Sequence, residues 1–166
     1  MRNLTLLLFA LLFSLSAGAQ VKVGYFSYDK AMKSMPDYLK AQTALKSLRA
    51  QYEAETQRVE DEFNKKYEEF LDGQRDFAPT ILQKRQSELQ ELMTKNISFK
   101  QEAERLLQQA ERDAMAPLKE KLATAVKEIG EEYGFTLILN TDGEQLQYVD
   151  PSMSEDINEL IQDYLQ

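Results

Sequence analysis

Two long stretches of helical periodicity, separated by one short break, constrain this chain more than any other feature. Apolar residues recur at steps of three and four on both sides of the segment FLDGQRDFAPTILQKR, at 70–85. The pattern stops at Asp72-Gly73 and restarts after Pro79. Such spacing predicts two long helices, over 36–72 and 80–133, each with one apolar seam.

The two apolar seams match each other when the chain folds back at residues 75–76. The first seam reads Tyr38, Ala41, Leu45, Leu48, Tyr52, Val59, Phe63 and Phe70. The second reads Leu82, Leu89, Leu92, Asn96, Phe99, Ala103, Leu106, Ala110, Ala114, Leu118, Leu122, Val126, Ile129 and Tyr133. In that register Tyr52 faces Phe99, and the polar break at Glu55 meets the polar break at Asn96. The sequence therefore predicts an antiparallel coiled-coil hairpin, roughly 55 Å long at 1.5 Å per residue, with its tip at 72–79.

The remaining residues predict a small body with short strands. The segments VKVGYF (21–26), FTLILN (135–140) and QLQYVD (145–150) have strand-like patterns, and the second is apolar throughout, as in a strand covered on both faces. We expect Asp29 to cap a short helical turn and Gly134 to end the second long helix. TDGE should form a hairpin turn before the third strand, and Ser154 should cap a final amphipathic helix. Pro117 should kink or re-seat the long helix where the hairpin enters the body.

This body is too small to be stable alone, so the sequence predicts self-association. Three short strands and one short helix bury little apolar surface, and unpaired strand edges can form hydrogen bonds with strands of another chain. We therefore expect several copies to pool their strands into one shared body. The residues expected in that oligomer body are Val21, Val23, Tyr25, Phe135, Leu137, Leu139, Leu146 and Tyr148.

The N-terminus predicts export. MRNLTLLLFALLFSLSAGAQ has a positive residue, a short apolar run and a small-x-small site, which are typical of a secretory signal peptide cleaved after Ala19 and not of a stable membrane anchor. A retained N-terminal anchor is the alternative. The predicted organisation is a signal peptide over 1–19, a body formed by 20–35 plus 117–166, and a hairpin over 36–116.

The composition excludes several classes of function. The chain has no histidine and no cysteine, so nucleophilic triads and zinc or copper sites are not expected. Its acidic balance, 28 Asp+Glu against 20 Lys+Arg, disfavours a nucleic-acid partner. Most carboxylates lie at expected solvent-facing helix positions. The sequence therefore predicts no catalytic residue, metal or cofactor, and it predicts that the protein is not an enzyme.

Apolar side chains near the tip are the candidate binding residues. An exposed aromatic close to a flexible turn can contact apolar stretches of another chain. The alternative is that these side chains pack the last layers of the coiled coil, which we favour for Phe63 and Phe70 but less for Phe77. The candidates are Phe63, Tyr67, Phe70, Leu71 and Phe77.

Four features across the mature chain resemble the Skp/OmpH-like periplasmic chaperones. They are the opening VKVGYFSYDKAMKSMPDYLKAQTAL, the long charged hairpin, the return PLKEKLATAVKEIGEEYGFTLIL and the ending LQYVDPSMSEDINELI. The resemblance implies an α+β fold in which a long helical hairpin, or tentacle, projects from a small β-body completed by oligomerisation, with a short C-terminal helix. It implies a homotrimer whose body strands are Val21–Ser27, Phe135–Asn140 and Gln145–Val149.

The resemblance also implies a function. Members of this family hold unfolded outer-membrane proteins in the periplasm without ATP, and they have no catalytic residues. Well-known members are basic, whereas this chain is acidic, so we expect no lipopolysaccharide site and weaker electrostatic capture of acidic clients. The alternative function is a periplasmic structural adaptor that docks one folded partner through the hairpin tip. The sequence does not identify the clients or the hairpin face that contacts them.

Overall fold

The computed structural model describes residues 21–144 and 146–166, which fold into two compact units. The first, here called the body unit, comprises residues 21–31 and 123–165, and the second, the hairpin unit, comprises 32–122 together with Gln166. The predicted signal peptide, 1–19, lies outside the described residues. The predicted domain boundaries, 20–35 plus 117–166 and 36–116, stay a prediction.

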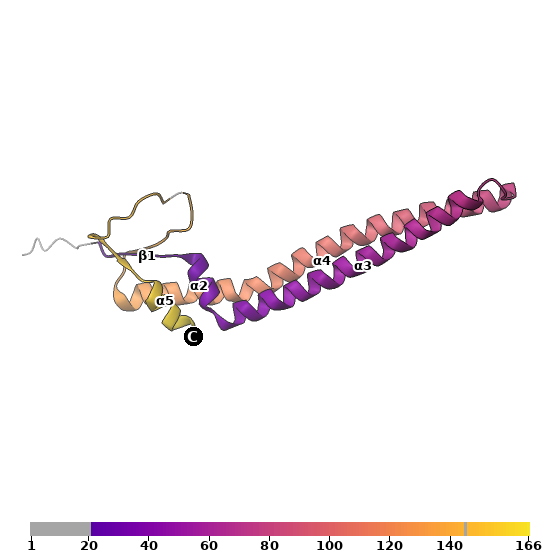
Figure 1. Cartoon of the computed structure of the whole chain (residues 1–166). Helices are drawn as coiled ribbons and strands as arrows, with labels where there is room; N and C mark the ends of the chain where they lie inside the picture. Colours follow the sequence, from indigo (N-terminus) through magenta and orange to yellow (C-terminus); the bar gives the residue numbers. More distant parts are fainter. Residues whose placement is uncertain (1–20, 145) are drawn as a thin grey trace, which may run out of the picture. The chain divides into compact units, whose positions relative to one another are not determined.

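Two long helices build the hairpin unit. Helix α3 (Pro36–Gly73) begins with its proline in the first turn, where the missing N–H costs nothing, after Met35 as N-cap residue. Helix α4 (Pro79–Tyr133) returns antiparallel to it, with Pro117 inside the helix (Figure 1). Among the described residues no helix is long and apolar enough to cross a membrane. The predicted α+β class is confirmed, with a long helical hairpin, a small sheet and a short C-terminal helix.

Contacts between α3 and α4 confirm the predicted antiparallel pairing. The rings of Tyr52 and Phe99 face each other with centroids 6.3 Å apart. The Asn96 Nδ2 donates a 2.9 Å hydrogen bond to the carbonyl oxygen of Val59. The predicted meeting of Glu55 and Asn96 is wrong, because Glu55 instead accepts hydrogen bonds from Arg58 one turn along its own helix.

Burial in the hairpin unit is uneven along its length. Helix α3 has no buried residue, and its seam side chains are only half-buried. Helix α4 buries its apolar residues only from Ala103 onward. Leu107 is buried where the predicted seam placed Leu106, and the last predicted seam residue, Tyr133, is exposed. The outer part of the hairpin is therefore held by half-buried contacts alone.

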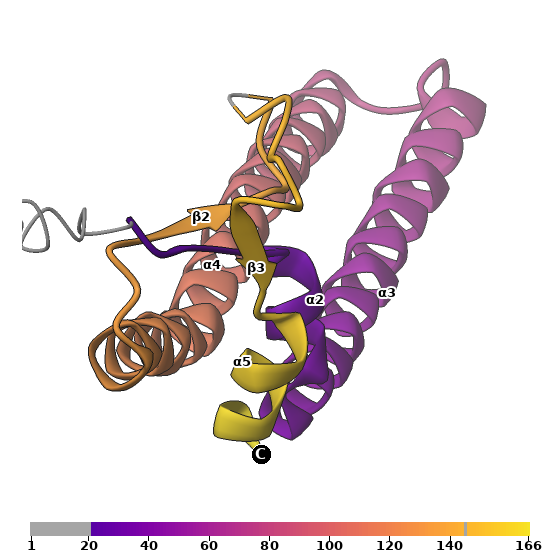
Figure 2. The same ribbon diagram turned by 90° about the vertical axis from the view of Figure 1, so that its left-hand side faces the viewer.

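A three-stranded parallel sheet lies in the body unit, in the order β2-β1-β3 (Figure 2). Its strands are β1 (Val23–Phe26), β2 (Leu137–Asn140) and β3 (Ser154–Asp156). Helix α5 (Asn158–Leu165) follows β3, as the C-terminal amphipathic pattern predicts. The buried apolar residues of this unit are Phe26, Ala31, Ala125, Ile129, Ile157, Ile161 and Leu165.

The third strand is not the predicted one. Residues 146–149 have no strand, so the predicted strand over Gln145–Val149 and its TDGE hairpin are wrong, and Gln145 itself lies outside the described residues. Ser154, the predicted helix cap, lies instead in β3, beside β1. Two contacts of Ile157 explain why the third strand lies at 154–156. Its N–H donates to the Tyr25 carbonyl at 3.0 Å, and its buried side chain lies against Gly24.

A side chain caps the start of α2, and a main-chain hydrogen bond closes the end of α4. Helix α2 (Tyr28–Ser34) begins after Ser27, whose Oγ accepts a hydrogen bond from the Lys30 N–H at 3.2 Å, so the predicted cap at Asp29 is wrong. Gly134 ends α4 with φ +69°, as predicted, and the Phe135 N–H donates to the Gly130 carbonyl. This 6→1 bond is the Schellman pattern, and it turns the chain toward β2.

Candidate functional site

The five apolar residues predicted near the tip do not form one cluster. The structure brings Phe70 and Phe77 together, with ring centroids 6.3 Å apart, and separately stacks Phe63 on Tyr67. Leu71 lies one turn after Tyr67 on α3 and is 43% exposed. The candidate surface therefore divides into a tip cluster and a second group on α3.

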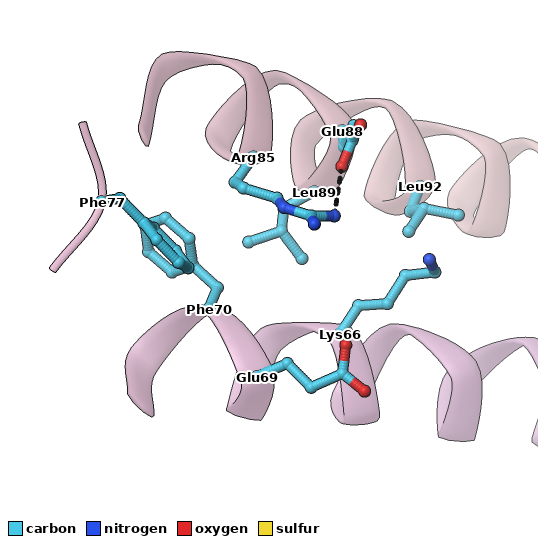
Figure 3. A pocket seen from close by; sticks show the side chains of 8 residues that line it. All are labelled: Lys66, Glu69, Phe70, Phe77, Arg85, Glu88, Leu89 and Leu92. Carbon is cyan, nitrogen blue, oxygen red and sulfur yellow. Dashed lines mark hydrogen bonds and ion pairs between the residues drawn. The ribbon is translucent and has the colours of Figure 1, made fainter. Parts of the chain in front are cut away.

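The tip cluster closes the end of the hairpin. The Phe77 ring lies so close to Gly73 that a Cβ there would be 2.5 Å from its Cζ. Both phenylalanines line a small pocket between the helices, in which Arg85 donates to Glu88 at 3.1 Å (Figure 3). The residues lining this pocket are Lys66, Glu69, Phe70, Phe77, Arg85, Glu88, Leu89 and Leu92. Phe70 and Phe77 are thus half-buried and serve to pack the turn.

The second group continues from α3 onto α4. Phe63 and Tyr67 stack with centroids 6.0 Å apart and planes 7° from parallel. Phe63 lines a shallow hollow together with Met93 and Ile97 of α4. Tyr67 is 45% exposed, Met93 51% and Ile97 49%. Large apolar side chains from both helices therefore meet solvent on one side of the hairpin.

The sequence prediction missed Met93 and Ile97. Both lie off the seam of α4, whose neighbouring seam residues are Leu92 and Asn96. Their spacing of four was the available signal, because two large apolar residues at i and i+4 outside the seam must share a second face. The seam pattern by itself does not reveal this second face.

Two further hollows follow the same side of the hairpin toward the start of α3. The first lies between the helices at Arg49, Tyr52 and Ala103 and shares Lys100 with the hollow at Phe63. The second shares Arg49 and Leu107 with the first and includes Leu39. The three hollows together form a discontinuous groove, which runs along one side of the hairpin unit.

Charged side chains near Met93 and Ile97 are paired, and Lys100 and Glu60, which line the same hollow, form an ion pair between the two helices. Lys95 and Glu91 pair at 2.7 Å on α4, and the bonded ammonium of Lys95 lowers the pKa of the Glu91 carboxyl. Arg105 lowers the pKa of Glu102 in the same way. These pairs are exposed, so water and salt screen them and each stabilises the hairpin only slightly.

The residues predicted for the oligomer body are mostly accessible in the single chain. Tyr148 is 75% exposed, Val21 57% and Leu137 50%. The others, Val23, Tyr25, Phe135, Leu139 and Leu146, are half-buried. The prediction that FTLILN is covered on both faces is therefore wrong for one chain, since β2 lies at a sheet edge with both its ends exposed.

The described residues contain no group of three or more Asp and Glu side chains arranged to hold a metal ion. Every buried side-chain nitrogen or oxygen in the described part of the chain has a hydrogen-bond partner. What the hairpin offers is accessible apolar surface on a charged scaffold, which suits binding of another polypeptide.

The chain matches one protein family over most of its length, and its fold is similar to that of a solved structure. Residues 22–165 match the family described as "Outer membrane protein (OmpH-like)". A solved structure of a candidate OmpH-like outer membrane chaperone from Caulobacter crescentus CB15 is similar, with a TM-score of 0.73 and 18% sequence identity. The alignment covers 90% of this chain and 86% of that one. No curated protein matches the chain significantly.

Proposed function

Because this chain belongs to the OmpH-like family of outer membrane proteins, we propose that it is a holdase chaperone for unfolded outer membrane proteins. It would bind these clients in the periplasm, after removal of its signal peptide, and prevent their aggregation before they insert into the outer membrane. The proposal includes neither ATP nor any other cofactor, and it assigns no catalytic role to any residue.

The observation that carries this proposal is the accessible apolar surface along the hairpin. Leu39, Tyr67, Met93 and Ile97 are all exposed. Leu39, Met93 and Ile97 line hollows between α3 and α4, and Tyr67 stacks on Phe63 of α3. An unfolded membrane protein presents many apolar segments with no fixed shape. A long surface that offers several weak apolar contacts can hold such a chain and still let it go.

We further propose that the protein acts as a homotrimer. Three tethered hairpins around one client would raise the effective concentration of each weak contact, so the overall affinity exceeds that of a single hairpin. Leu137 of the edge strand β2 and Val21, which precedes β1, are exposed in the body unit and support pooling of strands between copies. The hairpin unit carries 16 Lys+Arg against 17 Asp+Glu, so we assign it no lipopolysaccharide site.

The packing at the tip favours a holdase over an adaptor that docks through the tip. Phe70 and Phe77 contact each other, and Phe77 covers Gly73, so these rings are already used within the hairpin. An adaptor needs a tip side chain free for its partner, and of Phe70, Leu71 and Phe77 only Leu71 is exposed.

An aggregation assay tests the proposed function. A β-barrel membrane protein unfolded in urea is diluted into buffer with or without the full-length mature chain, and turbidity is followed. We expect the protein to suppress aggregation at a low molar ratio without added nucleotide. A turbidity trace that the protein leaves unchanged, while a soluble control protein at the same concentration also does nothing, would contradict the proposal.

A further inference from the structure

One face of the outer hairpin combines apolar and amide side chains and has few charges. It is formed by Phe63, Asn64, Tyr67 and Leu71 of α3 and by Gln86, Gln90, Met93, Ile97 and Gln101 of α4. We call it the amide–apolar face. Phe63, Asn64, Met93 and Ile97 line one hollow, Tyr67 stacks on Phe63, and the glutamines follow at steps of three and four along α4.

The side chains that define this face are all uncharged, in a chain with 29% charged residues. Glu60 and Lys100 also line the hollow at Phe63, but they form an ion pair between the two helices, so these two charges neutralise each other. Other ion pairs of this part of α4, such as Glu91–Lys95 and Arg85–Glu88, use residues outside the face. A partner of either charge therefore meets no strong field there.

We infer that the amide–apolar face binds unfolded polypeptide through apolar contacts and main-chain hydrogen bonds, without selecting the charge of the client. This inference rests on the proposed function and assigns it to one face. Side-chain amides offer two donors and one acceptor, so Gln86, Gln90 and Gln101 can bond to either backbone group of any sequence. The exposed parts of Met93 and Ile97 meet the client's apolar side chains.

An extended, unfolded segment fits this face better than another helix does. From Gln86 to Gln101 the face is roughly 22 Å long at 1.5 Å per residue, which matches about six or seven residues of extended chain. An unfolded chain presents free N–H and C=O groups beside its apolar side chains. A helix has satisfied those groups internally, so a second hairpin packed here would leave the glutamine amides without main-chain partners.

A pair of matched double variants tests the inference. M93Q/I97Q replaces both apolar side chains with good helix formers, whereas the control E91Q/K95Q removes the exposed 2.7 Å ion pair at the neighbouring positions. Binding of a fluorescent, urea-unfolded β-barrel membrane protein to each full-length mature protein is measured by anisotropy at low and high salt. Circular dichroism checks that both variants keep the helical content of the original protein.

We expect M93Q/I97Q to weaken binding about tenfold, or ~1.4 kcal/mol, and the control to change it less than about twofold. We also expect the affinity of the original protein to vary little with salt, because the contacts are uncharged. Equal losses in both variants, no loss in M93Q/I97Q, or a steep fall of affinity with salt would each overturn the inference. So would a changed molecular mass of M93Q/I97Q in light scattering, since that would identify the face as a contact between copies.

A second probe separates this inference from the proposed function. It is a soluble protein kept unfolded by reduction and carboxymethylation. If the original protein binds this probe but not the membrane protein, and M93Q/I97Q loses that binding, the proposed function fails while the inference stands. If the original protein and M93Q/I97Q bind the membrane protein equally well, the proposed function stands and the inference fails. If the original protein binds neither probe, both are wrong.

Discussion

At the scale of single residues, Gly134 is the position where backbone conformation alone dictates the amino acid. Its φ of +69° lies in the left-handed region, and a Cβ built there would meet no atom within 4 Å. Gly134→Ala should therefore lower the free energy of unfolding by about 1 kcal/mol through backbone strain, without steric clash. Urea unfolding followed by circular dichroism measures this loss. Gly130→Ala is the matched control. Gly130 lies inside α4, where alanine should raise the free energy of unfolding or leave it unchanged.

Residue-level prediction worked where one physical rule decides the outcome. Gly134 ends α4 and Pro36 starts α3 because backbone geometry permits little else at those positions. It failed for Ser154 and Asp29, where several polar residues compete for the same role. Ser154 precedes two acids, a pattern typical of a helix cap. The contact of the Ile157 side chain with Gly24 instead holds this segment beside β1, so Ser154 lies in β3. No local pattern reveals such a contact.

At the scale of elements, the seam residue Asn96 fixes how α3 and α4 pair. Its amide donates to the Val59 carbonyl at 2.9 Å, a bond that forms in one register only. Asn96→Leu should raise the stability of the hairpin by about 1 kcal/mol, because an apolar residue packs better between the helices, but it should loosen the register. Thermal unfolding measures the first effect. Disulfide cross-linking of cysteines placed at 52 and 99, and at 52 and 103, measures the second.

One result would contradict the prediction for Asn96→Leu. If Asn96→Leu lowers the unfolding temperature while the 52–99 cross-link forms as efficiently as before, the hydrogen bond stabilises the hairpin and does not select its register. Asn64→Leu is a suitable control, because Asn64 is an exposed α3 residue on the neighbouring hollow, outside the seam.

Elements with long periodic patterns were predictable, and short ones were not. The bounds of α3 and α4 differ from the predicted ones by one residue at each tip end, because many seam residues define each helix together. The strands have four residues or fewer, so each rests on contacts with β1 more than on its own pattern. The segment 145–149 alternates like a strand, yet β3 lies at 154–156. The exposed Met93 and Ile97 were missed because only the seam was read as apolar surface.

At the scale of the whole molecule, charge is divided unevenly between the two units. The body unit carries 3 Lys+Arg against 11 Asp+Glu, whereas the hairpin unit is near neutral. Copies that associate through the body unit must therefore overcome mutual repulsion, and apolar burial has to supply the difference. Exposed apolar residues of that unit, Leu137 in β2 and Val21 before β1 among them, are the side chains available for this burial.

The proposed association can be tested at the edge strand β2. Leu137 is 50% exposed on this strand, which pairs only with β1 in the described structure. Leu137→Lys places a charge where another copy's apolar surface would lie, so we expect the molecular mass in light scattering to fall from an oligomer to a single chain. The far-ultraviolet circular dichroism should stay helical, because α3 and α4 do not depend on this side chain.

Glu131→Lys is the matched control for the edge-strand variant. Glu131 is an exposed residue of the body unit on α4, where it pairs with Lys127 at 3.8 Å, so the exchange removes only a weak surface ion pair. It also reduces the negative charge of the unit more than Leu137→Lys does, and charge relief alone should strengthen association. If both variants stay oligomeric, β2 is not the interface between copies, and the pooling of strands through this edge is wrong. If only Leu137→Lys dissociates, its effect comes from apolar contact, since repulsion between acidic bodies would have been eased in both.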